Sequence, residues 1–139
     1  MQPQVHRVET LLRRAAAGGG GMDATIAQSV ALWDDVGAAL VPIIGQRGMS
    51  ALYARALHLA GARHPWLRDA SRTGDVSAFP ALAEAMSHQV QDDAILAVVD
   101  LFETFERLLV TLIGASLSER LLQPLRDDPS DPARQDISP

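Results

Sequence analysis

Carboxylates are the most numerous charged side chains in this 139-residue sequence, and several of them occur as adjacent pairs. Two carboxylates can act as general acid and base when both reach the same substrate. The pairs here are Asp34-Asp35, Asp92-Asp93 and Asp127-Asp128. Neighbours in a helix point about 100° apart, so an adjacent pair does not form one acid–base site. We interpret Asp92-Asp93 as the beginning of a helix, where the helix dipole favours negative charge.

Asp100, Glu103 and Arg107 share one face of the helix that we predict over residues 92–113. Glu103 precedes Arg107 by four residues, which is the favourable orientation for a helical ion pair. A carboxylate-bridged metal site in a bundle needs Glu-x-x-His motifs, and the sequence has none. We therefore predict a solvated polar stripe and no metal site.

The sequence lacks the motifs of common catalytic and cofactor sites. It has no cysteine, which excludes disulfides, thiol catalysis and cysteine-ligated metals. It has no Gly-x-Ser-x-Gly elbow, phosphate-binding loop or dinucleotide fingerprint. Arg47 could bind an anion beside a helix N-terminus, but we favour a plain interhelical turn there. These observations predict a protein that is not an enzyme and has no cofactor.

Charge and composition bound the partners and the location. The net charge is −5, and all 12 basic residues are arginines that do not cluster, so no nucleic acid partner is predicted. No apolar run approaches the roughly 20 residues of a membrane span. Residues 5–12 include His6, Arg7 and Glu9 and so lack a signal-peptide core. We predict a cytoplasmic protein that does not enter a membrane.

The length and the glycines predict one all-α domain with an attached N-terminal segment. Residues 1–21 form an amphipathic helix and a flexible tether of four glycines at 18–21. A bundle domain follows over residues 22–125, with Asp23 as the first N-cap. Gly37 allows another helix to approach the first main helix, which ends at Gly45. Residues 126–139 form a disordered acidic tail.

The strongest helical pattern covers residues 92–113, and we predict further helices over 49–62, 79–90 and from a capping box at Ser116. The apolar residues of 92–113 recur by three and four and cover most of the helix surface. That helix is either the centre of the fold or part of a dimer interface. Its apolar stripe consists of Ile95, Val98, Phe102, Phe105, Leu109 and Leu112.

One short sequence nearly occurs twice. Leu40–Gly45 reads Leu-Val-Pro-Ile-Ile-Gly, and Leu109–Gly114 reads Leu-Val-Thr-Leu-Ile-Gly. Each ends an apolar helical run at a glycine, which suits a helix C-terminus. The sequence therefore predicts a five- or six-helix bundle with a long central helix and a pseudo-repeat of helix, glycine turn and helix. The two turns would frame a groove or a pseudo-twofold surface for another protein.

Two resemblances extend this prediction. His58, midway along a helical run, resembles the phosphate-accepting histidine of phosphotransfer four-helix bundles. Those domains place a basic residue and a glycine soon after the histidine, whereas here no basic residue follows until Arg63. Residues 41–67 and 108–122 resemble a family of small helical proteobacterial proteins without established activity. That second resemblance implies an association with signalling or regulatory proteins.

The function that the sequence favours is a non-enzymatic protein-interaction or regulatory module that forms a homodimer. The alternatives are histidine phosphotransfer through His58 and a small-molecule sensor with an apolar pocket. The candidate interaction residues are Gly45, Arg47, Tyr53, His58, Trp66, Phe102, Phe105 and Gly114.

Overall fold

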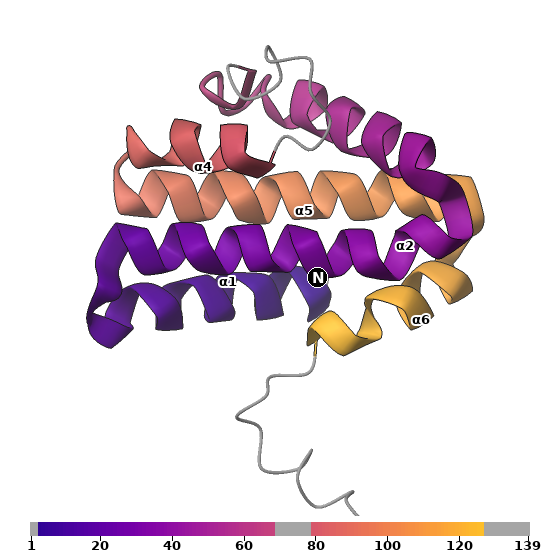
Figure 1. Ribbon diagram of the computed structural model, residues 1–139, viewed down its shortest axis with the longest axis horizontal. Coiled ribbons are helices and arrows are strands. Elements are labelled where there is room, and N and C mark those ends of the chain that lie inside the picture. Colours follow the sequence, from indigo (N-terminus) through magenta and orange to yellow (C-terminus); the bar gives the residue numbers. More distant parts are fainter. Residues whose placement is uncertain (1–2, 69–78, 127–139) are drawn as a thin grey trace, which may run out of the picture.

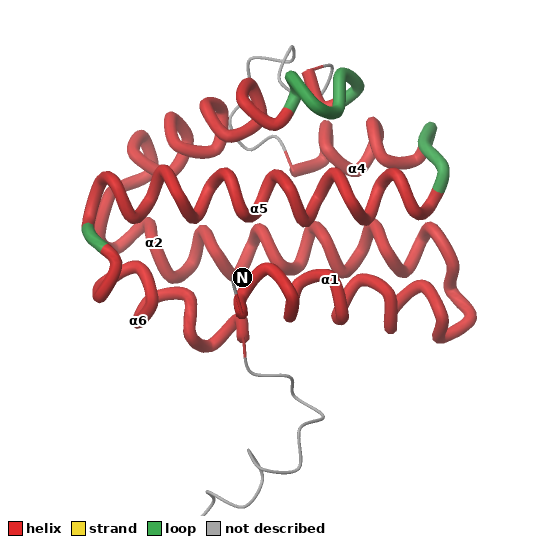
Figure 2. The backbone as a smooth tube through the Cα atoms, turned by 180° about the vertical axis from the view of Figure 1, so that it is seen from behind, coloured by secondary structure: helices red, strands yellow, loops and turns green. Residues whose placement is uncertain are grey.

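The computed structural model describes the backbone of residues 3–68 and 79–126, and that part of the chain is almost entirely helical, without strands. The helices pack side by side in a bundle (Figures 1 and 2). The all-α prediction is therefore confirmed. The elements are α1 (Pro3–Ala15), the π-helical turn η1 (Ala16–Gly20), α2 (Gly21–Ala60), α4 (Phe79–Ser87), α5 (Gln91–Ile113) and α6 (Ala115–Arg126).

Helix α2 is broken at Gly45, which gives it a first arm over residues 21–44 and a second arm over residues 46–60. Gly45 has φ 80° and ψ 165°, a conformation that side-chain-bearing residues almost never adopt. Gly114 ends α5 with nearly the same geometry, φ 91° and ψ 159°. Both breaks fall at the glycines that the sequence predicted. Both lie at the same end of the bundle, which we call the glycine end (Figure 1).

Helix α5 occupies the interior of the bundle, as predicted for residues 92–113. It packs against α1, α2 and α6. Its buried side chains lie on most of its circumference, including Ile95, Val98, Phe102 and Phe105. Most of the broad apolar surface that suggested a dimer interface is thus covered within one chain, while Leu96, Val110 and Leu112 stay exposed.

Four aromatic rings form the centre of the core. Trp33 contacts Tyr53 edge to face at a centroid distance of 5.1 Å, and Phe105 in the same way at 5.2 Å. Phe102 lies tilted against the indole at 6.1 Å. All four side chains are buried, and such edge-on pairs contribute about 0.5–1.5 kcal/mol each beyond their burial. The cluster joins both arms of α2 to α5.

Helix α1 belongs to the same core, because Val8 and Leu12 are 2% and 1% exposed. Arg13 adds a surface link, since its Nη1 donates to Asp92 Oδ1 of α5 at 2.9 Å. The glycines that predicted a flexible tether form the turn η1, with Gly19 at φ 98°, which folds α1 back beside α2. Residues on both sides of the expected domain boundary near Met22 therefore pack into one core.

Three local predictions were wrong. Helix α2 begins at Gly21, ahead of the expected N-cap Asp23, because the glycine turn continues directly into the helix. A Cβ on Gly37 would meet no atom within 4 Å, so this glycine does not serve close helix approach. Helix α6 begins at Ala115 rather than behind a Ser116 cap. The acidic tail beyond Arg126 lies outside the described residues.

We predict opposite effects for alanine at glycines of different conformation. Gly45→Ala and Gly114→Ala should each lower the free energy of unfolding by about 1–3 kcal/mol, because Ala is strained at both geometries. Gly37→Ala is the control, and it should raise that free energy by up to about 1 kcal/mol, since this position is helical and has space. Urea denaturation followed by circular dichroism measures all three. Equal effects at the three positions would contradict the described backbone.

Candidate functional site

The structure separates the eight candidate interaction residues into two groups. Tyr53, Phe102 and Phe105 belong to the aromatic core, and Trp66 is half-buried against it. Their apolar character therefore serves the packing of this chain. The other four are exposed on the surface: Gly45, Arg47, His58 and Gly114.

Tyr53 is buried in the apolar core. Burial raises the pKa of its phenol well above the ordinary value of 10.0, because ionisation would place a charge in an apolar site. The edge contact with Trp33 comes from the second arm of α2 folding back over α5. Tyr53 therefore fixes the position of that arm rather than forming part of the surface.

His58 lies exposed on the second arm, one helical turn after the exposed Arg55. An exposed imidazole on a helix is what phosphoryl transfer requires. The basic residue that should follow it is Arg63, and Arg63 lies beyond the end of α2. Its side chain is bound to α5, as described next. In the structure, too, no basic residue follows His58 on the same helix, as the phosphotransfer pattern would require.

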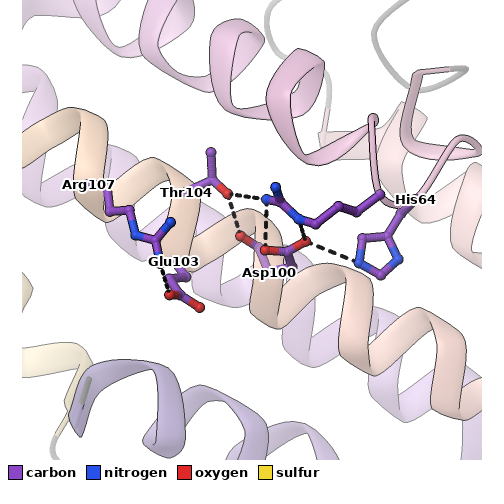
Figure 3. A network of polar contacts seen from close by, with 6 residues as sticks. His64, Asp100, Glu103, Thr104 and Arg107 are labelled. Atoms are coloured by element: carbon purple, nitrogen blue, oxygen red, sulfur yellow. Dashed lines mark hydrogen bonds and ion pairs between the residues drawn. The ribbon is translucent and has the colours of Figure 1, made fainter. Parts of the chain in front are cut away.

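A polar cluster connects the turn after α2 to the middle of α5 (Figure 3). Arg63 holds the Asp100 carboxylate with two hydrogen bonds, from Nε to Oδ2 at 2.5 Å and from Nη2 to Oδ1 at 2.9 Å. His64 Nε2 lies 3.2 Å from the same Oδ2. Asp100 is 22% exposed, and a forked contact of this kind is among the stronger polar contacts in proteins.

Thr104 completes this cluster one turn further along α5. Its hydroxyl accepts a hydrogen bond from Arg63 Nη2 at 3.1 Å and donates one to the main-chain oxygen of Asp100 at 2.8 Å. The hydrogen bond to Asp100 raises the pKa of the Arg63 guanidinium, and its charge is permanent at any physiological pH. On the same side of α5, Arg107 forms the predicted ion pair with Glu103.

The geometry of this cluster indicates a structural contact. The Thr104 hydroxyl already donates its proton to a carbonyl, so it is not poised as a nucleophile. The charge of Asp100 is paired with that of Arg63. Within the described part of the chain, no group of three or more His, Asp or Glu side chains could hold a metal ion. The cluster ties the segment after α2 to α5.

Sequence reasoning placed Asp100 in a solvated stripe; its side chain is 22% exposed, but its pairing with Arg63 and His64 was not predicted. Its partners Arg63 and His64 are more than 35 positions away in the chain, and helical spacing carries no information about them. The available signal was an acid in the middle of the most apolar helix, a place where a carboxylate needs a partner.

The glycine end carries exposed apolar side chains. In the described part of the chain, five large apolar side chains are exposed. Three of these five lie in the last helical turns before Gly45 and Gly114. Ile43 is 51% exposed, Val110 38% and Leu112 58%. The turns that follow present the exposed Arg47 on one side and Glu119 on the other.

One helical stretch passes a length and composition test for a membrane span. It runs over Arg7–Ala60 and contains an 18-residue window with a mean hydropathy of 1.2, of which 28% is buried in the fold. The backbone leaves helical geometry at Gly19 and Gly45 within this stretch. Asp34 and Asp35 are exposed on it. The core helix of a soluble protein can have the same length and composition.

Comparisons of the chain with protein-family models, with curated proteins and with solved structures find no match. The resemblance to small proteobacterial helical proteins therefore stays a prediction, and the functional argument depends on the described geometry.

We predict that Asp100→Asn destabilises the fold, because the amide keeps the size of the side chain but cannot neutralise Arg63. Charge-assisted hydrogen bonds contribute about 1.5–3 kcal/mol, and the 54% exposure of Arg63 reduces the expected loss to about 1 kcal/mol. Asp34→Asn, at an exposed site, is the matched control and should stay within about 0.5 kcal/mol of the parent. Chemical denaturation compares the two. A loss no larger than that of the control would show that the cluster does not hold the turn to α5.

Proposed function

We propose that this protein is a non-enzymatic interaction module of a regulatory kind, that its contact surface is the glycine end, and that its partner is a second copy of the chain. The observation that carries the proposal is the exposure of Ile43, Val110 and Leu112 in the last turns before Gly45 and Gly114.

Exposure of these side chains is unfavourable for an isolated chain. Each large aliphatic side chain gains about 1.5–3 kcal/mol when it is fully buried. Exposed apolar groups that gather at one end of a folded protein mark a contact surface more often than single groups spread over it do. The two glycine breaks support this interpretation, because they end both helices abruptly and leave the last apolar turns facing outward.

The chemistry of the glycine end favours a second copy. In a two-fold dimer, each surface meets the same surface of its partner, so the residues must be compatible with themselves. Aliphatic side chains from two helices meet that requirement without repulsion. Most of the apolar face of α5 is already in the core, so α5 contributes to this contact only through the exposed Val110 and Leu112 of its last turns.

Sedimentation equilibrium over a wide concentration range tests the proposal. The parent protein should reversibly form a dimer. Ile43→Asp and Leu112→Asp should each raise the dimer dissociation constant by about 30-fold, since a central apolar contact is worth about 2 kcal/mol. These sites are already exposed, so the fold should be retained.

Val90→Asp is the matched control. Val90 is 69% exposed and precedes α5 at the opposite end of the bundle, so this change should leave the dissociation constant unaltered. A parent protein that stays monomeric at its highest soluble concentration would overturn the proposed partner. Equal weakening by Val90→Asp would overturn the proposed surface.

A further inference from the structure

The two glycine breaks align two segments of the chain, and the buried positions of the first arm then recur in α5, which buries further residues as the more central helix. Gly45 and Gly114 are 69 residues apart. At that shift, every buried residue of the first arm falls on a buried residue of α5. The first-arm residues are Thr25, Ser29, Leu32, Trp33, Val36 and Leu40, and their counterparts are Ala94, Val98, Leu101, Phe102, Phe105 and Leu109.

The agreement continues beyond the breaks. Met49 and Tyr53 of the second arm are buried, as are their counterparts Ser118 and Leu122 in α6. Exposed residues correspond too, since Ile43 falls on Leu112. The shift was set by the glycines alone, so the burial patterns test it independently.

The helices that come before these segments share the spacing of their buried residues, at an offset of 74 positions rather than 69. Helix α1 precedes the first arm and buries Val8 and Leu12, four residues apart. Helix α4 precedes α5 and buries Leu82 and Met86 with the same spacing. Each half of the chain therefore contains a short helix, a long helix, a glycine break and a final helix.

The arrangement in space indicates a two-fold rotation between the halves. The first arm and α5 run side by side in the same direction towards the glycine end (Figure 1). Beyond their breaks, the second arm and α6 turn back on opposite sides of this pair (Figures 1 and 2). Helix α4 packs on α2, and α1 packs on α6, so each short helix contacts the other half.

The strongest sign of the axis is a contact between equivalent residues. A residue that lies on a two-fold axis meets its own counterpart. Trp33 and Phe102 are counterparts at the 69-residue shift, and their rings pack together at 6.1 Å. The rotation axis thus passes between them, parallel to the first arm and α5.

We propose that the chain is two copies of one helical unit joined in tandem and paired about this axis, and that the paired face is one through which a single unit would bind a second copy. The proposal does not depend on association at the glycine end. The halves differ in their polar contacts, because Asp100, which binds Arg63, has Ala31 as its counterpart.

Spin-label distances in the full chain test the proposal. The sequence has no cysteine, so pairs of introduced cysteines can be labelled without removing any native residue. Ala27 and Ala51 belong to the first half, and their counterparts at the 69-residue shift are Leu96 and Arg120. All four are exposed. The double variants are 27/51, 96/120, 27/120 and 51/96, and unchanged thermal melting checks the fold of each.

Pulsed electron–electron double resonance should give two pairs of equal distances. The distances within the halves, 27/51 and 96/120, should agree within about 5 Å, one helical turn. The distances between the halves, 27/120 and 51/96, should agree equally well, which a two-fold rotation requires and a translation or screw does not. A larger difference within the halves would overturn the repeat, and a larger difference between them would overturn the axis. Dimerisation is excluded by diluting each labelled variant into unlabelled protein.

Discussion

The packing of Trp33 is the interaction on which the arrangement of the helices depends. The indole lies in the first arm of α2, yet its edge and faces meet Tyr53 from the second arm and two phenylalanines from α5. With only three Phe, two Trp and one Tyr in the whole chain, no other aromatic cluster of this size could replace it. The remaining core is aliphatic, and its contacts adjust more readily to small shifts of a helix.

This cluster requires the chain to reverse at a defined place. The second arm reaches Trp33 only because α2 turns sharply at Gly45, in a geometry reserved for glycine. The polar contact between Arg63 and Asp100 then holds the far end of the second arm on α5. The same two breaks leave aliphatic side chains outside the core at the glycine end. One structural device therefore makes the core possible and creates the surface that we propose for association.

Much of the fold could be predicted from local patterns. The long apolar helix and both glycine breaks followed from periodicity and from the near-repeat of one hexapeptide, and the Glu103–Arg107 pair followed from helical spacing. What could not be predicted was tertiary. Phe102, Phe105 and Tyr53 looked like surface anchors because a sequence does not show which apolar face finds a partner within the chain. The partners of Asp100 come from a turn that is distant in the sequence. Likewise, local spacing does not show which helices Val8 and Leu12 of α1 pack against.

The titration of Tyr53 tests the central packing most directly, because it is the only tyrosine in the chain. Burial raises the pKa of the folded phenol above its ordinary 10.0. The stability that depends on a neutral phenol is therefore complete below about pH 10 and declines as the pH rises further, since the unfolded chain ionises first. Tyrosinate absorbance should appear only together with the loss of the helical circular dichroism signal. Ionisation with a pKa near 10.0 while the helices stay intact would contradict the account.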